Sequence, residues 1–154
     1  MPQDTDSRHD LTILGQTRTS YPATPGEATL ETFANRHPGR DYWVTFECPE
    51  FTSRCPVTNQ PDFGHITIRY IPDHWCIESK SLKLYLFAFR ETQTFHEEVV
   101  NRILDDVKAA CQPREIMVEG RFNPRGGISI CVTCRDRQDE SGTTSTAGRV
   151  RDPS

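Results

Sequence analysis

The chain has 154 residues, 34% of them hydrophobic and 26% charged, and a formal net charge of −4 at pH 7. This length favours one domain, the acidic balance argues against a nucleic-acid partner, and no apolar run approaches the roughly 18 residues of a membrane helix. The charged N-terminus is not followed by a hydrophobic segment, which argues against a secretory signal and predicts a cytoplasmic protein.

The two ends of the chain differ in composition from its middle. Residues 1–38 combine Thr, Ser, Pro and charge with few apolar residues, and we interpret them as an N-terminal arm. Residues 136–154 end in a run of Gly, Ser, Thr and Arg. Such a run cannot bury enough surface to offset the entropy of ordering it, so we expect a disordered tail. The single domain is therefore expected over residues 39–135.

Four segments alternate apolar and polar residues with the period of two that is typical of a half-buried strand. They cover residues 42–48, 66–70, 116–122 and 128–134. The last two are joined by Asn123-Pro124-Arg125-Gly126-Gly127, which indicates a hairpin with a glycine-rich turn.

Two helices are expected between the strand pairs. Apolar residues recur at every fourth position from Phe95 to Cys111, an amphipathic pattern that Pro113 ends. Residues 81–90 are apolar on nearly all sides, which indicates a short buried helix. The order ββααββ predicts an α+β fold, a four-stranded antiparallel sheet with both helices on one face. Because this sheet leaves edges and apolar surface open, we expect the chain to oligomerise.

The six cysteines predict no disulfide scaffold, because thiols stay reduced in a chain without a secretory signal. Cys131 and Cys134 form a C-x-x-C pair, but a strand would point them to opposite faces. A structural zinc site needs four converging ligands, so we expect no metal.

The segment over residues 51–65 places a thiol and a carboxylate in what we interpret as a proline-bracketed loop between two strands. Cys55 ends a Ser/Thr-rich turn beside Arg54, and free backbone N–H groups and a neighbouring cation both favour a thiolate. The alternative is that Cys55 is a small buried hydrophobe and Asp62 a turn former. Spacing alone does not distinguish these two interpretations.

Two serines and two lysines lie where a strand gives way to the first helix. Ser79 or Ser81 would cap that helix, while Lys80 and Lys83 oppose its dipole and suit a bound phosphate. The alternative is an ordinary N-cap with two solvated lysines.

The start of the second helix and the late turn carry further candidates. Glu97 either offsets the helix dipole or accepts two N–H donors from a guanine-like edge, and the neighbouring His96 is either a surface residue or a ligand. Arg121 and Arg125 beside the glycine-rich turn either contact a phosphate or are solvated.

Several separate motifs in a fixed order resemble the NADPH-dependent 7-cyano-7-deazaguanine reductases, the nitrile reductases of queuosine biosynthesis, in their short single-module form. The resemblance runs from about Asp41 to Cys134. Asn59 stands where glycine is usual, and asparagine also tolerates left-handed backbone. The motifs are Cys55-Pro56, Gln60-Pro61-Asp62-Phe63, Glu78-Ser79-Lys80-Ser81-Leu82-Lys83, Phe95-His96-Glu97 and Pro124-Arg125-Gly126-Gly127.

This resemblance implies a tunnelling fold, in which ββααββ subunits join into a barrel with active sites between subunits and two pentamers stack into a decamer. It also implies reduction of the 7-cyano-7-deazaguanine nitrile to the primary amine 7-aminomethyl-7-deazaguanine, in tRNA queuosine biosynthesis. Two NADPH are consumed for each product, and no metal, nucleic acid or membrane takes part.

The resemblance also implies residue roles. Cys55 adds to the nitrile as the nucleophile and forms a thioimide, and Asp62 is the general acid. The expected substrate-binding residues are Ile77, Glu78, Ser79, His96 and Glu97. The expected cofactor-binding residues are Lys80, Ser81, Lys83 and Arg125.

Two other functions are left open by the residues. The first is another tunnelling-fold enzyme acting on a purine or pterin, although the five histidines show no convincing zinc-ligand spacing. The second is a non-catalytic module that binds tRNA through its basic hairpin, against which the acidic net charge argues.

Overall fold

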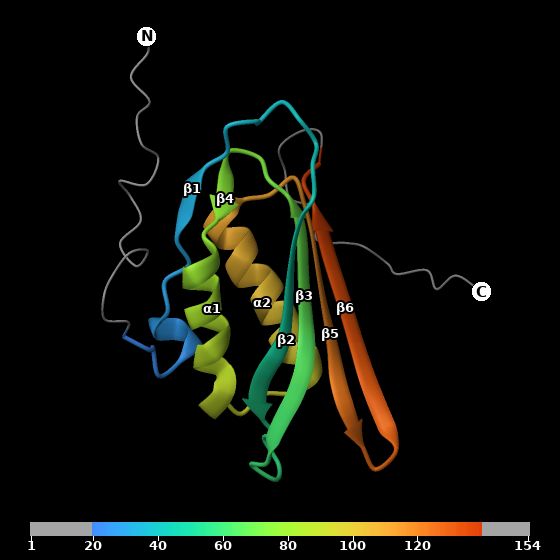
Figure 1. Cartoon of the computed structure of the whole chain (residues 1–154). Coiled ribbons are helices and arrows are strands. Elements are labelled where there is room, and N and C mark those ends of the chain that lie inside the picture. Colours follow the sequence, from blue (N-terminus) through green and yellow to red (C-terminus); the bar gives the residue numbers. More distant parts are fainter. Residues whose placement is uncertain (1–19, 140–154) are drawn as a thin grey trace, which may run out of the picture.

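The computed structural model describes residues 20–139. Four antiparallel strands form a sheet in the order β2-β3-β5-β6, and two helices cover one of its faces (Figure 1). The predicted ββααββ order is confirmed. Its elements are β2 (Val44–Arg54), β3 (Pro61–Ile71), α1 (Ser79–Phe87), α2 (His96–Cys111), β5 (Glu115–Arg125) and β6 (Ile128–Arg137).

A second, two-stranded sheet pairs β1 (Thr32–Ala34) with β4 (Trp75–Ile77). The short 3-10 helix η1 (Pro25–Glu27) precedes β1, and another, η2 (Ala88–Glu91), follows α1. Residues 20–38, which we predicted to belong to an arm, therefore pack against the domain rather than extending from it. Residues 1–19 of that prediction lie outside the described chain.

The C-terminal boundary also differs from the prediction. β6 continues to Arg137, and the Asp136 carboxylate lies 2.7 Å from Lys108 Nζ on α2. The predicted tail from residue 136 is therefore wrong at its first residues, because this ion pair and the pairing with β5 extend the strand. Residues 140–154 lie outside the described chain.

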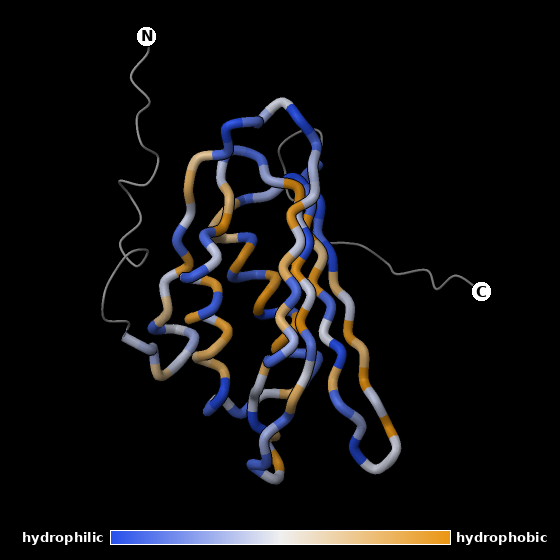
Figure 2. The backbone as a smooth tube through the Cα atoms, viewed as in Figure 1, coloured by the Kyte–Doolittle hydropathy of each residue, from blue (hydrophilic) through white to orange (hydrophobic). Residues whose placement is uncertain are grey.

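The core lies between the sheet and the helices. On α2 the residues Val99, Ile103, Val107 and Cys111 are all fully buried, which confirms the predicted amphipathic helix. Apolar and polar residues alternate along the strands (Figure 2). The helix ends at Gln112, whose left-handed backbone precedes Pro113.

A bulge in β2 explains why the sequence pattern seemed to stop at Cys48. The register with β3 shifts between Cys48 and Phe51, so one extra residue enters β2. Even-numbered residues face the helices before the bulge and odd-numbered ones, including Phe51 and Ser53, face them after it. The predicted loop over residues 51–65 is therefore wrong: β2 and β3 form a long hairpin whose connection covers only residues 55–60.

The face of the sheet away from the helices is polar. Glu47 on β2 accepts a hydrogen bond from the Thr67 hydroxyl at 2.9 Å and lies 2.5 Å from His65 Nε2. β2 and β6 are open edges, as predicted. Among the helices of residues 20–139, none has the length and apolarity to cross a membrane.

Candidate functional site

Cys55 lies in the tight connection between β2 and β3. Its N–H donates to the Gln60 carbonyl and its carbonyl accepts from Asn59 N–H, both at 2.9 Å. Asn59 has a left-handed backbone with φ of 57°, which explains how it replaces the glycine that is usual there. The turn therefore holds the thiol at the end of a rigid hairpin.

Hydrogen bonds to the sulfur favour the thiolate. The Thr58 hydroxyl, followed by the backbone N–H groups of Thr58 and Val57, lowers the pKa of Cys55, against smaller opposing effects of desolvation and of the Asp62 charge. The backbone N–H groups expected from the turn thus contribute, but the largest cause, the Thr58 hydroxyl, was not predicted. Arg54, also expected to help, instead binds the Glu91 carboxylate at 2.8 Å and the Asn59 carbonyl at 3.1 Å.

These contacts of Arg54 tie the Cys55 turn to the segment that leads into α2. The backbone of Arg54 exchanges hydrogen bonds with Thr92 O and Thr94 N, at 2.9 and 3.0 Å. The Gln93 amide adds a 3.1 Å hydrogen bond to the Asn59 side chain. The nucleophile and the start of α2 are therefore held in a fixed relation.

Asp62 is buried at the start of β3 and faces the helices. Its Oδ1 lies 3.1 Å from Arg125 Nε at the end of β5, and its Oδ2 lies 3.4 Å from His96 Nε2 at the start of α2. Arg125 also donates from Nη2 to the Pro61 carbonyl at 2.9 Å. A buried carboxylate thus lies against an arginine and a histidine side chain.

His96 is oriented by an aromatic stack. Its ring lies 3.9 Å from the Phe122 ring between centroids, at an interplanar angle of 9°. A Cβ at Gly64 would come within 2.8 Å of the Phe122 ring, and one at Gly120 would come equally close to that ring and within 2.6 Å of Val100. Two glycines on β3 and β5 therefore leave the slot that the Phe122 ring fills.

Two buried side-chain polar atoms of the described chain have no hydrogen-bond partner, Ser53 Oγ and His96 Nε2. Ser53 lies directly opposite Asp62 in the β2–β3 pair. Sequence reasoning assigned no role to Ser53, because the bulge that turns it inward follows the end of the recognisable alternation.

Glu97 follows His96 in the first turn of α2, and its side chain is exposed. Within residues 20–139 its carboxylate makes no hydrogen bond or ion pair. In one subunit it is therefore available to a ligand.

The other predicted site residues gather at the start of α1. The cap is Glu78 and not Ser79 or Ser81, because the Glu78 carboxylate accepts from the N–H groups of Lys80 and Ser81, both at 2.7 Å. The Ser81 hydroxyl is fully buried, accepts from Glu31 N–H at 2.9 Å and donates to the Glu78 carbonyl at 2.8 Å. Ser81 therefore serves the fold in one subunit, and its hydroxyl is not presented to a cofactor.

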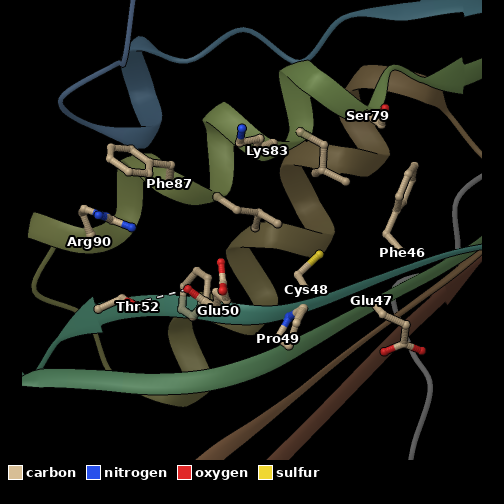
Figure 3. Close-up of a pocket in the computed structure, with 13 residues that line it drawn as sticks. Phe46, Glu47, Cys48, Pro49, Glu50, Thr52, Ser79, Lys83, Phe87 and Arg90 are labelled. Atoms are coloured by element: carbon tan, nitrogen blue, oxygen red, sulfur yellow. Dashed lines mark hydrogen bonds between the residues drawn. The ribbon is translucent and has the colours of Figure 1, made fainter.

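A groove lies between α1 and the bulge of β2 (Figure 3). Its volume is about 340 Å³, within the range of small-molecule sites. Ser79, Lys83 and Arg90 border it on the helix side, and the Cys48 sulfur points toward α1. This groove is apolar at its base, with the cations Lys83 and Arg90 on its helix side and the acidic residues Glu47 and Glu50 on its β2 side.

The two groups of predicted site residues do not meet within one subunit. Ile77 N–H donates to the Tyr70 hydroxyl at 2.8 Å, and Tyr70 lies near the end of β3 while Asp62 lies near its start. At about 3.3 Å per residue along β3, the Cα atoms of Asp62 and Tyr70 are roughly 25 Å apart. Figure 1 likewise shows the start of α1 well away from the β2–β3 turn.

Comparison with known proteins adds independent findings. The family described as "QueF-like protein" matches residues 61–141. A relative from Porphyromonas gingivalis, named NADPH-dependent 7-cyano-7-deazaguanine reductase, is 54% identical over 129 residues, covering 84% of this chain and 83% of the relative. A relative of the same name from Oceanobacillus iheyensis is 52% identical over 132 residues, covering 86% and 80% respectively.

A solved structure supports the fold. The apo crystal structure of an archaeosine synthase described as QueF-Like aligns with a TM-score of 0.55 at 22% identity, covering 62% of this chain and 91% of the other. At this identity the likeness concerns the fold alone, and it agrees with the predicted tunnelling-fold subunit.

Proposed function

Since the chain belongs to the family of NADPH-dependent 7-cyano-7-deazaguanine reductases, we propose that it reduces the nitrile of 7-cyano-7-deazaguanine to 7-aminomethyl-7-deazaguanine with NADPH. The observation that carries the proposal is the β2–β3 hairpin, whose tight turn places the Cys55 thiol at the same end of the sheet as the buried Asp62 carboxylate. A role in tRNA queuosine biosynthesis stays a prediction.

The proposed chemistry begins at the sulfur. The Cys55 thiolate adds to the nitrile carbon while a proton from Asp62 reaches the nitrogen, which gives a thioimide C=N bond. NADPH supplies two hydrides in succession, so two are consumed for each product. The first hydride and one proton at nitrogen give a thiohemiaminal, which loses the Cys55 thiolate and a proton to give an imine. The second hydride and a further proton give the primary amine.

The surroundings of Asp62 hold its carboxyl group in a fixed orientation for the proposed role. His96 and Arg125 lie on opposite oxygens of the carboxyl group and fix its direction, and the Phe122 stack fixes His96 in turn. Arg125, predicted to contact a cofactor phosphate, keeps further guanidinium N–H donors for that contact. We propose that Arg125 binds both the Asp62 carboxylate and a cofactor phosphate.

We propose that substrate binding draws on two subunits. Glu97 and His96 from one subunit would hold the deazaguanine, with Ile77, Glu78 and Ser79 contributed by another. The separation of roughly 25 Å within one chain supports this, as do the open edges of the sheet. Glu78 keeps acceptor lone pairs after capping α1, because a carboxylate offers about four. The decamer of two pentamers stays a prediction.

The cofactor phosphates fit the helix side of the groove at α1, where its cations lie. Lys83 and Arg90 are both exposed there. Lys80 lies about one helical turn before Lys83 on α1, outside the residues that line the groove. We keep Lys80, Lys83 and Arg125 as the proposed phosphate contacts and leave out Ser81, whose hydroxyl is bound inside the domain.

Intact-mass spectrometry tests the proposal. Incubation with 7-cyano-7-deazaguanine without NADPH should add the mass of the substrate to the unmodified chain, because the addition expels no atom. Cys55→Ala should lose the adduct, whereas Cys131→Ala, which removes an exposed thiol on β6, should keep it. An NADPH-oxidising preparation that forms no adduct would overturn the mechanism.

A further inference from the structure

Ser53 has a fully buried hydroxyl without a partner. Its exposed fraction is 0%, and its Oγ makes no hydrogen bond within residues 20–139. An unsatisfied buried hydroxyl destabilises a folded chain, whereas alanine would occupy the same space without that cost. The position therefore gives the resting subunit no benefit that alanine would not.

The hydroxyl lies beside the proposed acid. Ser53 and Asp62 are directly paired across β2 and β3, and both are buried against the helices. The Cβ atoms of such a pair are about 5 Å apart, so rotation about the Cα–Cβ bond brings the Ser53 hydroxyl to the Asp62 carboxyl group.

We propose that Ser53 is a positioning residue for Asp62, donating a hydrogen bond to the carboxylate once Asp62 has given its proton to the substrate nitrogen. This inference rests on the proposed function and deepens it. A hydroxyl both donates and accepts, so Ser53 accepts from the protonated acid and donates to the carboxylate. Only the Asp62 proton is transferred, and Ser53 keeps its own hydrogen.

The other groups around Asp62 approach its carboxylate from β5, α2 and the turn, so a donor from β2 does not compete with them. Arg125 from β5 lies against Oδ1 and His96 from α2 against Oδ2, while Cys55 approaches from the turn. Each carboxylate oxygen offers two acceptor sites, so both oxygens retain a free site. Ser53 is the neutral donor that β2 places beside them.

Ser53→Ala tests the proposal in the full chain. We expect kcat for NADPH oxidation with 7-cyano-7-deazaguanine to fall about tenfold. The carboxylate loses a donor that favours its charged form, so the alkaline limb of the pH–rate profile should move up by about one pH unit. The Tm should stay unchanged or rise, because an unsatisfied group has been removed.

Two variants serve as controls. Ser53→Thr keeps the hydroxyl and should keep the alkaline limb of the unmodified chain. Ser81→Ala removes a serine that is equally buried but makes two hydrogen bonds, so it should lower the Tm by several degrees. The two alanine variants therefore predict opposite effects on stability.

Each outcome decides the question. A Ser53→Ala chain with unchanged kcat and pH profile overturns the positioning role. A lower Tm with an unmoved alkaline limb, or a failure to fold, also overturns it, because the hydroxyl then serves the fold. Adduct formation by the unmodified chain tests the proposed function separately, so loss of the adduct there is distinguishable from failure of this inference.

Discussion

Two fully buried serines at opposite ends of the subunit differ in how their hydroxyls are satisfied. Ser81 at the start of α1 makes two hydrogen bonds, and Ser53 near the β2–β3 turn makes none within residues 20–139. Satisfied buried polar groups stabilise a fold, and unsatisfied ones are tolerated where chemistry needs them. The buried serine at the α1 end thus stabilises the fold, whereas the one at the turn end lies beside the residues proposed to react.

The cysteines show the same contrast. Hydrogen bonds lower the pKa of Cys55 in the turn, whereas burial raises the pKa of Cys111 on α2 to about 12 and that of Cys48 on β2 to about 11. Surroundings rather than residue type therefore set the pKa of each of these thiols. The following variants test the difference between the two ends.

The largest effect is expected for Asp62→Asn at the turn end. An amide cannot deliver the proton, so kcat should fall by about a hundredfold or more, while the substrate Kd changes little. Glu97→Gln is the comparison and should mainly weaken binding. Steady-state kinetics and calorimetric titration measure both, and equal losses of rate and affinity in each variant would contradict the assigned roles.

The next effect is expected for Glu78→Ala at the α1 end. Two N–H groups lose their carboxylate acceptor, which should lower the free energy of unfolding by about 2 kcal/mol. Urea unfolding measures it. Glu98→Ala removes an exposed carboxylate from the first turn of α2 and should change the free energy of unfolding by no more than about 0.5 kcal/mol. Equal losses of stability in the two variants would refute the role of Glu78 as the cap of α1.

Gly120→Ala should affect both properties of the turn end. The new Cβ would meet Val100 and the Phe122 ring, so we expect a loss of about 1.5 kcal/mol from overpacking, together with a lower kcat as Phe122 shifts under His96. Gly39 has nothing within 4 Å, and Gly39→Ala should leave Tm and kcat unchanged. If Gly120→Ala changed neither stability nor kcat, the slot for the Phe122 ring would not depend on this glycine.

The smallest effect is expected for Thr58→Val. Losing the hydroxyl donor raises the pKa of Cys55, so less thiolate is present at neutral pH. Alkylation of Cys55 by iodoacetamide should slow by roughly threefold at pH 7, which corresponds to a rise of half a pKa unit. The pH dependence of this alkylation should move to higher pH, and the rates of the two chains should converge at high pH. Thr133→Val on the polar face of the sheet is the control. If it shifted the pH dependence of Cys55 alkylation equally, the Thr58 hydroxyl would not be a specific donor to the thiol.

The kinds of element could be predicted because their signals are local. A period of four from Val99 to Cys111 marks α2 in any context, and alternation marks the strands on either side of the helices. The bulge at residues 49–50 interrupts the alternation on β2, because one extra residue exchanges the inward and outward faces. The predicted loop over residues 51–65 was wrong for this reason.

By itself the sequence determined the ββααββ order of the main sheet and its two helices, because those patterns are local. The family and the candidate pair Cys55 and Asp62 came from the resemblance that several separate motifs carry. Only the tertiary structure decided that Arg125 lies on Asp62, that Phe122 stacks on His96 and that Ser53 turns inward without a partner. Strand register and side-chain packing set these contacts between residues far apart in the chain, and no local pattern records them.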